Sequence, residues 1–191
     1  MKTFIISLKI FLFFTILTGV VYPLLITGIA QITFPAKANG SIIYKDNKAI
    51  GSTLIGQQFD SVIYFSSRPS AIAYNPLPSG GSNYGLTNIK LKNQVADRKT
   101  HFWKLNQLDS LKTEIPSEML FASASGLDPH ISLKAAMLQV DRIVNARKFN
   151  KIQKQKIVEC VQEHIEERQF LCMGEQRINV LLLNIELDKI K

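Results

Sequence analysis

The stretch IFLFFTILTGVVYPLLITGIAQITF, residues 10–34, carries no charged side chain and decides the class of this 191-residue protein. Fifteen of its 25 residues are Ile, Leu, Val or Phe. A helix of that length spans about 37 Å, which is enough to cross a hydrocarbon core of about 30 Å with some tilt. We therefore expect a single transmembrane helix at residues 10–34.

A cleavable signal peptide is the alternative interpretation of this segment. Lys2 and Lys9 would be its basic region, and Ala36-Lys37-Ala38 fits a small-x-small cleavage site. However, the apolar run is about twice as long as a usual signal core. Pro23 in its middle does not argue against an anchor, because membrane helices tolerate proline where neighbours satisfy the freed backbone groups. The length favours a permanent anchor.

Small residues recur at every fourth position of the predicted span, namely Thr15, Gly19, Pro23 and Thr27. On a helix these positions lie close together, and small residues at such spacing allow a second helix to approach. We interpret them as a candidate packing face in the membrane. The alternative is that Gly and Thr are simply common in membrane spans.

The orientation of the span follows from length rather than from charge. Lys2 and Lys9 flank one end, and Lys37, Lys45 and Lys48 flank the other, so neither side dominates. A short tail before a first hydrophobic segment usually stays inside, whereas long domains translocate regardless of charge. We expect a cytoplasmic tail at residues 1–9, the transmembrane helix at 10–34, and a soluble α/β domain at 35–191 outside the inner (plasma) membrane.

The composition after the span excludes several classes of protein. Residues 37–191 hold 21 of the 23 Lys and Arg and all 15 Asp and Glu, so this part is mildly basic. The two cysteines are too few for a disulfide scaffold or a four-cysteine zinc site. No basic motif interleaved with aromatic residues is present, so we expect no nucleic-acid binding.

Hydrophobic periodicity predicts a mixed α/β fold for the domain. The expected architecture of the whole chain is therefore a single N-terminal transmembrane helix followed by a mixed α/β globular domain. Strands are expected on both sides of an Asp46-Asn47 turn within 41–55, and at 62–66 and 178–184; the last, a short apolar run, is also compatible with a helix. Residues 67–88, rich in Pro, Gly, Ser and Asn, are expected to form a long loop. Helices are expected at 89–106, 133–148 and 151–168.

Ser132 is a natural N-cap for the second of these helices, whose buried face should include Ala136, Met137 and Val140. Cys160 should lie on the apolar face of the third helix, with Cys172 in the loop beyond it. Free thiols are common in such positions, whereas an extracytoplasmic location would also permit a disulfide between the two.

The segment SASGLDPHIS, residues 123–132, places Ser, Asp and His close together without forming a recognisable catalytic motif. Triad members normally come from separate loops, and no GxSxG elbow surrounds a serine here. One Asp and one His are also too few ligands for a metal ion. We expect no catalytic residues and no metal site.

The segment SGGSNYG, residues 79–85, lacks the lysine that a phosphate-binding P-loop requires. Its glycines are instead expected to permit turns or the close approach of a partner. Arg68 precedes Pro69, so its backbone should be extended. Its side chain is expected to pair with a carboxylate of the same domain or of a neighbouring protein.

Seven blocks of sequence, in this order, resemble the C subunit of Kdp-type potassium-transporting P-type ATPases. They are LTGVVYPLLITGIAQ (17–31), GSTLIGQQF (51–59), YFSSRPSAIAYNP (64–76), SGGSNYGLTN (79–88), SASGLDPHIS (123–132), QVDRIVNAR (139–147) and GEQRINVLLLNIELD (174–188). The departures are small: Leu86 and Leu133 stand where the family often has Pro, and Ala124 where it often has Gly.

The resemblance implies a non-catalytic subunit of a high-affinity, ATP-driven potassium uptake complex in the inner membrane. The implied partners are a channel-like potassium-selecting subunit, an ATP-hydrolysing P-type subunit and a very small single-span subunit. No cofactor is expected to bind stably, because the complex handles ATP and potassium. The family is described as a catalytic chaperone that raises the ATP affinity of the hydrolysing subunit through a transient ternary complex, and its SASGLDPHIS-like stretch has been likened to nucleotide-binding signatures.

These implications define a set of candidate partner or nucleotide contacts: Arg68, Ser79, Gly80, Gly81, Asn83, Ser125, Gly126, Asp128 and His130. ATP is cytoplasmic, so an external domain cannot touch it. The alternative hypothesis is an external cap over the potassium entrance of the channel-like subunit, with only an indirect effect on ATP binding. A secreted hydrolase and a solute-binding module that acts alone are the remaining, less favoured readings.

Overall fold

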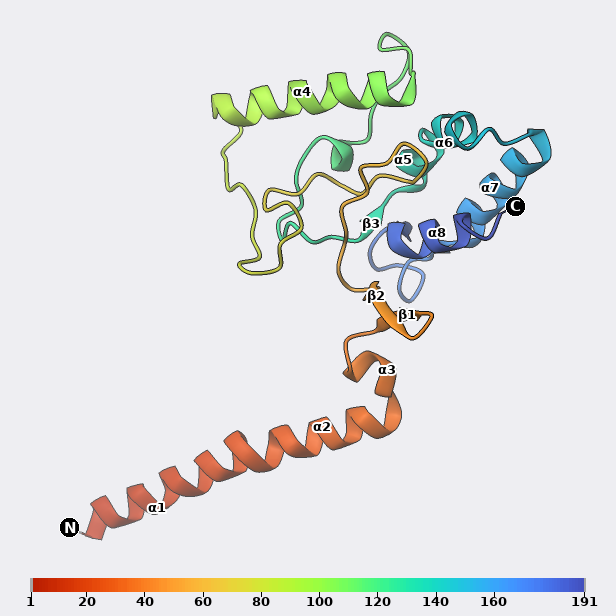
Figure 1. Cartoon of the computed structure of the whole chain (residues 1–191). Coiled ribbons are helices and arrows are strands. Elements are labelled where there is room, and N and C mark those ends of the chain that lie inside the picture. The colour runs from red at the N-terminus through yellow and green to blue at the C-terminus, as the bar shows by residue number, and fades with distance from the viewer. Residues whose placement is uncertain (1, 191) are drawn as a thin grey trace. The chain divides into compact units, whose positions relative to one another are not determined.

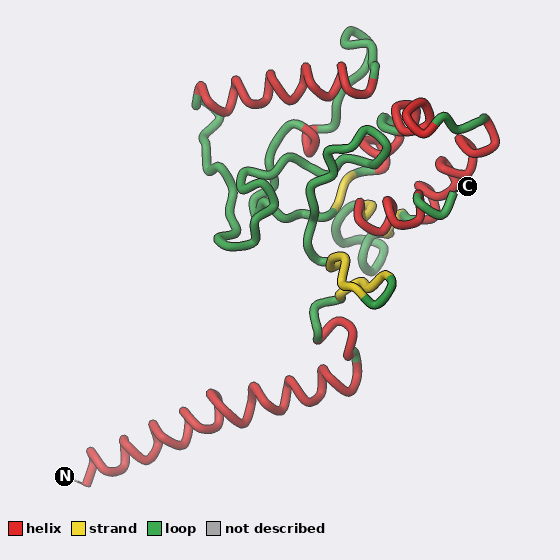
Figure 2. The backbone as a smooth tube through the Cα atoms, in the orientation of Figure 1, coloured by secondary structure: helices red, strands yellow, loops and turns green. Residues whose placement is uncertain are grey.

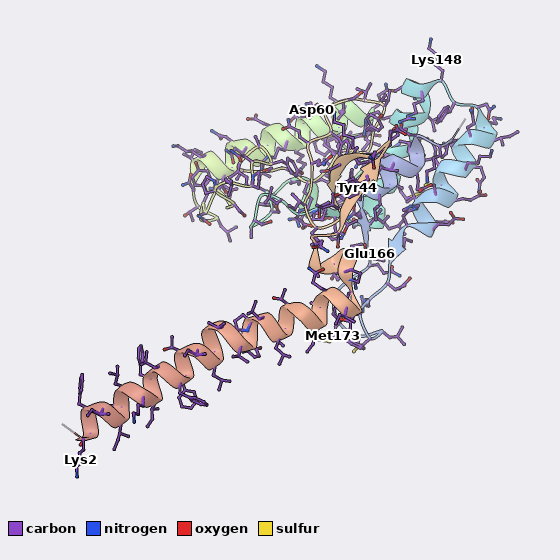
Figure 3. All side chains as sticks on the ribbon, turned by 60° about the horizontal axis from the view of Figure 1, so that its bottom comes forward. Lys2, Tyr44, Asp60, Lys148, Glu166 and Met173 are labelled. Carbon is purple, nitrogen blue, oxygen red and sulfur yellow. The ribbon has the colours of Figure 1, made fainter. Side chains whose placement is uncertain are left out.

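A long apolar helix comes first in the computed structural model, which describes residues 2–190 (Figure 1). It consists of α1 (Lys2–Ile16), the π-helical turn η1 (Leu17–Val21) and α2 (Tyr22–Thr33). Together they form a 32-residue stretch, Lys2–Thr33, that is long and apolar enough to cross a membrane. None of its residues is buried, and its side chains stand out around the helix (Figure 3).

The π-helical turn lies immediately before Pro23 and widens the helix there. The N–H of Tyr22 donates to the carbonyl of Leu17, five residues earlier. Proline has no N–H for the normal helical bond, and such wide turns relieve its steric conflict with the preceding turn. Within the predicted packing face, the hydroxyls of Thr15 and Thr27 donate to the carbonyls of Phe11 and Pro23, each at 2.8 Å.

A short helix and a hairpin complete this first unit, which ends at Ser52. They are α3 (Pro35–Ala38) and the antiparallel strands β1 (Ile42–Lys45) and β2 (Lys48–Ser52). Asp46 and Asn47 form the turn with φ values of 50° and 62°, as expected of residues that tolerate the left-handed region. The two strands predicted on either side of this turn are therefore confirmed.

The second unit begins at Thr53 and is built on a small antiparallel sheet with the order β3-β5-β4. Its strands are β3 (His130–Ile131), β4 (Ile165–Glu166) and β5 (Arg177–Asn179). The helices are α4 (Ile89–Asn106), the 3-10 turn η2 (Ser117–Met119), α5 (Leu133–Met137), α6 (Val140–Arg147), α7 (Lys151–Glu163) and α8 (Val180–Leu187). The core between the sheet and α5–α8 includes Ile131, Ile143, Ile157, Val161, Ile178, Leu183 and Leu187.

The predicted helices are confirmed in existence, with corrections at their ends. The helix at 89–106 has the bounds expected, and Ser132 caps α5 by accepting a bond from the N–H of Ala135. The helix predicted at 133–148 is two helices, because the chain turns at Leu138–Gln139 and directs Gln139 into the core. Met137 is consequently exposed rather than buried. The helix predicted at 151–168 was wrong beyond Glu163, where the chain enters β4.

The strand predicted at 62–66 is wrong, because side chains rather than a neighbouring strand satisfy this backbone. The side chain of Asn184 accepts from the N–H of Phe65 at 2.8 Å and donates to its carbonyl at 3.0 Å. Gln139 accepts from the N–H of Ser66 at 2.7 Å. Figure 2 shows the segment from Thr53 to Asn88 as loop. The buried side-chain amides of Asn184 and Gln139 thus replace the hydrogen bonds that a neighbouring strand would make.

A buried arginine anchors the same segment from α6. Arg142 is 4% exposed and donates to the carbonyl of Val62 at 2.5 Å and to Asn106 Oδ1 at 2.9 Å. It also donates to Gln139 Oε1 at 2.8 Å. Burial lowers the pKa of Arg142 to about 10, which leaves it charged at neutral pH. A buried cation whose donors are satisfied by neutral acceptors holds three chain segments together.

The strand predicted at 178–184 is wrong beyond Asn179, where the chain becomes the helix α8. The side chain of Asn179 accepts from the N–H groups of Leu181 and Leu182 at 3.1 and 3.2 Å, and so caps the helix. Val180, Leu181, Leu183 and Leu187 are buried. An apolar run buried on most sides fits either element, and the cap decides between them.

Both cysteines are free thiols in the structure. Cys160 is half-buried in α7, and Cys172 is exposed in the turn between β4 and β5. Burial, followed by the charges of Glu186 and Glu163, raises the pKa of Cys160 to about 11. The thiol of Cys160 therefore stays protonated and unreactive at neutral pH.

Candidate functional site

Two loops that are distant in sequence lie against each other and bring most of the predicted site residues together. One runs through residues 56–80, and the other through 123–130. The carbonyl of Ser125 accepts from the N–H of Gly80 at 3.0 Å and from Ser79 Oγ at 2.9 Å. Ser70 Oγ donates to the carbonyl of Gly126 at 2.7 Å. These bonds hold the two backbones side by side.

Gly126 and Gly81 stand where the two loops approach each other closely. Gly126 has φ +71°, and a Cβ there would lie 2.5 Å from Ile72 Cγ1 and 2.9 Å from the carbonyl oxygen of Gly80. A Cβ on Gly81 would lie 3.1 Å from the carbonyl oxygen of Ala124. A Cβ on Gly80 would meet no atom within 4 Å. Gly126 is thus required both by its backbone conformation and by its neighbours.

A series of ionisable side chains connects the loops to the sheet. Arg68 Nη1 lies 2.5 Å from Asp128 Oδ2, and His130 Nδ1 lies 3.3 Å from Asp128 Oδ1. On its other side, His130 Nε2 lies 3.8 Å from Glu166 Oε1, and Glu166 Oε2 pairs with Arg177 Nε at 2.9 Å. The chain of contacts runs from a loop through β3 to the β4–β5 pair.

Asp128 is the centre of this network and stays ionised at any physiological pH. Burial raises its pKa, but the hydrogen bonds from the side chain and N–H of His130, together with the Arg68 charge, outweigh burial and hold the pKa at about 2. The N–H of His130 donates to Asp128 Oδ1 at 3.0 Å. The carboxylate therefore accepts from both neighbours and fixes the turn that leads into β3.

Tyr74 holds the backbone around Arg68 in place through hydrogen bonds. Its hydroxyl donates to the carbonyl of Arg68, and its N–H donates to Ser70 Oγ at 3.0 Å. Burial is the main cause that raises the pKa of Tyr74 to about 12. The phenol is thus a structural donor that orders the segment around Arg68.

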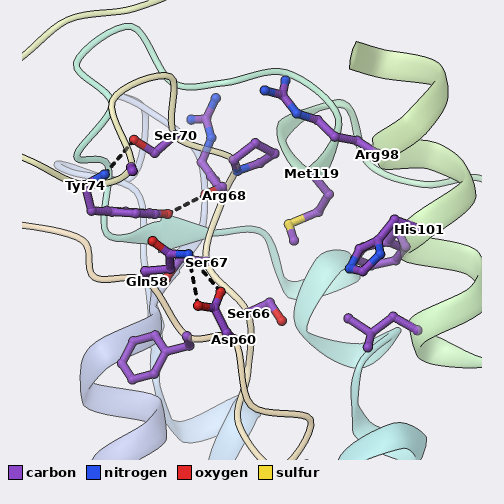
Figure 4. Close-up of a pocket in the computed structure, with 15 residues that line it drawn as sticks. Gln58, Asp60, Ser66, Ser67, Arg68, Ser70, Tyr74, Arg98, His101 and Met119 are labelled. Carbon is purple, nitrogen blue, oxygen red and sulfur yellow. Dashed lines mark hydrogen bonds between the residues drawn. The ribbon is translucent and has the colours of Figure 1, made fainter. Parts of the chain in front are cut away.

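A pocket of about 490 Å³ opens beside Arg68, between residues 58–74 and α4 (Figure 4). Arg68 forms part of one wall, while Arg98 and His101 from α4 form part of another. Phe59, Phe102, Leu105 and Met119 add apolar surface. Asp60 also lines the pocket and accepts from Gln58 Nε2 at 2.9 and 3.0 Å.

The structure thus assembles most of the residues predicted from sequence, but not all of them. Arg68 contacts Asp128, Asp128 contacts His130, and Ser79 and Gly80 contact Ser125, whose hydroxyl accepts from the N–H of Leu127 at 3.1 Å. Asn83 is exposed, with φ 53°. Among residues 2–190, no group of three or more His, Cys, Asp or Glu side chains is placed to hold a metal ion.

Sequence reasoning missed several residues of this region. Glu166 and Arg177 join the charged network only because β4 and β5 pair with this register, which no local motif signals. Arg98 and His101 lie on the helix that was predicted, but nothing in their spacing pointed to a pocket. Tyr74 stands in the quoted block YFSSRPSAIAYNP and was overlooked as a support for Arg68.

Comparisons with known proteins extend these observations to the whole chain. The family model described as "KdpC: K+-transporting ATPase, c chain" matches residues 4–189. A protein of Caldanaerobacter subterraneus named potassium-transporting ATPase KdpC subunit is 44% identical over 181 residues, which cover 95% of this chain and 92% of the relative. Proteins with the same name from Dechloromonas aromatica and Geotalea uraniireducens are each 45% identical over 188 residues and cover 96% of this chain and 95% and 96% of the relatives. With its apolar N-terminal helix and its mixed α/β domain, this chain belongs to the KdpC family of potassium-transporting ATPase subunits.

Proposed function

We propose that this chain is an accessory, non-catalytic subunit of a high-affinity potassium uptake complex, and that its domain acts outside the inner membrane. In this proposal the helix at residues 10–34 anchors the chain, and the domain caps the potassium entrance of the channel-like subunit. ATP hydrolysis belongs to the P-type subunit, and the very small single-span subunit is the third partner. Any effect on ATP affinity is then indirect.

One observation carries the preference for a cap over direct nucleotide binding. Several polar groups of SASGLDPHIS, the segment likened to a nucleotide signature, are engaged within the domain. The carbonyl of Ser125 accepts from Gly80 and Ser79, and the N–H of Gly126 donates to the carbonyl of Ser123 at 3.2 Å. A phosphate site needs free N–H groups that converge on one point. Here the N–H of Gly126 is used within its own loop, and the N–H of Ser123 donates to the carbonyl of Pro69 at 3.3 Å, which holds one loop to the other.

The charge arrangement supports the same preference. Asp128, with a pKa of about 2, is a permanent anion in the centre of the segment. Its partner Arg68 is already in contact with it. A nucleotide phosphate brought to this segment would meet a carboxylate before it met a free cation. The segment is better suited to shaping a rigid domain surface than to binding a polyphosphate.

The catalytic-chaperone hypothesis with direct ATP contact requires a cytoplasmic domain, whereas the cap hypothesis requires an external one. The side of the membrane on which the domain lies therefore tests the proposal. A cysteine placed at the exposed Asn83, in a Cys160→Ala/Cys172→Ser background, is treated with a membrane-impermeant thiol reagent in intact cells. We expect labelling in intact cells. A cysteine that replaces Ser7 serves as the matched control and should react only after the cells are opened.

The reverse pattern would contradict the proposal. If the cysteine at position 83 reacts only in opened cells, the domain is cytoplasmic, the cap hypothesis fails, and direct action on ATP binding becomes the better account. Potassium-dependent ATPase activity of the complex, measured with each cysteine variant, verifies that the labelled protein is functional.

A further inference from the structure

We propose that the pocket between residues 58–74 and α4 binds a monocarboxylate with an apolar body, and that Arg98 is its anion contact. The pocket has a volume of about 490 Å³, which is within the range of small-ligand sites. Arg68 lines the pocket (Figure 4), whereas its partner Asp128 does not. The inference is independent of the cap function proposed above.

Arg98 is the cation that remains available in this pocket. Its Nη1 donates to the carbonyl of Leu120 at 2.9 Å, which holds the side chain in place. Among residues 2–190, no carboxylate lies within ion-pair distance of Arg98. Figure 4 shows the side chain extending from α4 toward the wall that holds Arg68. A guanidinium that is positioned but not neutralised is suited to pair with an incoming carboxylate.

Arg68 offers the pocket a second hydrogen-bond donor, its Nε, but its positive charge is already paired with Asp128. Its Nη1 is paired with Asp128, but its Nε is buried and has no hydrogen-bond partner within the described chain. A buried donor without a partner is costly unless a ligand or water satisfies it. The hydroxyls of Ser66, Ser67 and Ser70 also line the pocket.

The balance of charge selects a monoanion over a phosphate dianion. Asp128 neutralises Arg68, and Asp60 contributes a negative charge to the lining. Of the two arginines that line the pocket, Arg98 is the one without an ionic partner in the described chain, and Asp60 already offsets part of the positive charge, so a doubly charged phosphate would be compensated less well than a monoanion. A carboxylate carries one charge and matches the planar fork of arginine.

The rest of the lining indicates an apolar body behind the carboxylate. Phe59, Phe102, Leu105 and Met119 form this surface, and the two phenylalanines come from different walls. Such a surface accommodates an aromatic or branched aliphatic group. Two sources offer this chemistry: a free carboxylic acid, or an acidic side chain of a neighbouring subunit that is flanked by apolar residues.

The test uses the full-length chain in lipid nanodiscs with 4-fluorophenylacetate as the probe, observed by fluorine NMR. We expect saturable binding of the probe and no comparable binding of the neutral 4-fluorophenylacetamide. Inorganic phosphate should not displace the probe. Arg98→Gln should weaken binding by about tenfold or more, because a charged hydrogen-bond pair is lost. Lys92→Gln, on an exposed position of the same helix, should leave binding unchanged.

A second variant keeps the proposal testable if Arg98→Gln fails to fold. His101 lines the pocket and is exposed, so His101→Asp adds a negative charge without removing a buried group. It should abolish binding of the carboxylate. Equal binding by the wild type and both folded variants, or equal binding of the acid and its amide, would overturn the proposal.

The assembled potassium-transport complex then distinguishes the two sources, and only this step rests on the proposed function. If the complex binds the probe as the isolated chain does, the natural ligand is a free acid. If the complex excludes the probe, a carboxylate of a neighbouring subunit occupies the pocket. Failure of the isolated chain to bind the probe overturns the pocket proposal and leaves the cap function untouched.

Discussion

At the scale of single residues, Asp128 determines how the two loops meet the sheet. It lies between Arg68 and His130, and its carboxylate also accepts from the backbone of the residue that begins β3. His130 passes the contact on to Glu166, on the far strand of the sheet. Removing the charge of Asp128 therefore affects its contacts with both Arg68 and His130, whereas removing Arg68 affects only one of these contacts.

The pKa of Asp128 predicts how this contribution depends on pH. Its pKa in the folded domain, about 2, is below the ordinary value of 3.8. The ionised carboxylate therefore stabilises the fold above about pH 4, and this stabilisation is lost as the pH falls toward 2. We expect Asp128→Asn to lower the free energy of unfolding at pH 6, and the difference from wild type to shrink between pH 4 and pH 2.

Urea unfolding of the full chain in detergent, followed by the fluorescence of its one tryptophan, Trp103, measures this difference. Glu175→Gln, at an exposed position, is the control and should change stability little at any of these pH values. A difference between Asp128→Asn and wild type that stays constant from pH 6 to pH 2 would show that the charge of Asp128 is not what stabilises the loops.

Gly126 gives a second prediction at this scale. Gly126→Ala combines a left-handed backbone with a contact of 2.5 Å to Ile72, and should destabilise the domain by about 1–3 kcal/mol. Gly80→Ala is the matched control, because a Cβ there meets open space and its N–H still donates to Ser125. Thermal unfolding compares the two; similar midpoints for both variants would contradict the assigned role of Gly126.

At the scale of secondary-structure elements, the domain uses side chains to hold a long irregular segment. Asn184 from α8, and Gln139 and Arg142 from α6 and the turn before it, provide donors and acceptors to residues 62–66. These side chains are nearly or fully buried. The helices therefore serve two purposes, since their apolar faces form the core and their buried amides anchor the loop that shapes the pocket and the charged network.

Asn184→Ala tests this arrangement directly. It leaves both the N–H and the carbonyl of Phe65 without partners in a buried environment, so we expect a loss of about 2 kcal/mol or more in unfolding free energy. Asn145→Ala, on the exposed side of α6, should cost less than about 0.5 kcal/mol. A loss of similar size in both variants would indicate that helix propensity, rather than the bond to Phe65, is responsible.

At the scale of the whole molecule, the chain combines an apolar helix that buries no residue within the chain with a domain that has its own core. The apolar helix must therefore find its environment outside this chain, in lipid or against other membrane helices. Lipid and neighbouring membrane helices are both consistent with a chain of the K+-transporting ATPase c chain family. We expect a second helix to approach the span at the predicted face of Thr15, Gly19, Pro23 and Thr27.

Gly19→Leu is the prediction that belongs to this scale. A Cβ on Gly19 has open space within the chain, so leucine should not disturb the monomer, but it should block close helix packing. We expect the recovery of the other subunits in co-purification to fall by about fivefold or more, a loss of roughly 1 kcal/mol or more in association. Gly28→Leu, equally open but outside the predicted face, is the control. Equal recovery for both variants would remove the packing face from consideration.

Local sequence alone determined the long apolar helix, the hairpin at Asp46-Asn47, the helix at Ile89–Asn106 and the Ser132 cap. In each case the signal lies within a few residues: uninterrupted hydrophobicity, a turn that requires φ above zero, or a capping hydroxyl. The predicted site residues Arg68, Ser79, Gly80, Ser125, Gly126, Asp128 and His130 were found in short motifs for the same reason.

Only the tertiary structure decided the contacts between those motifs and the course of the segments between them. The segment at 62–66 is not a strand because Asn184 and Gln139, more than 70 residues away in sequence, satisfy its backbone. Glu166 and Arg177 join the charged network through strand register, and Arg98 reaches the pocket because α4 lies across it. Burial and long-range hydrogen bonding select among conformations that local sequence permits equally, so these features emerge only when the chain is folded.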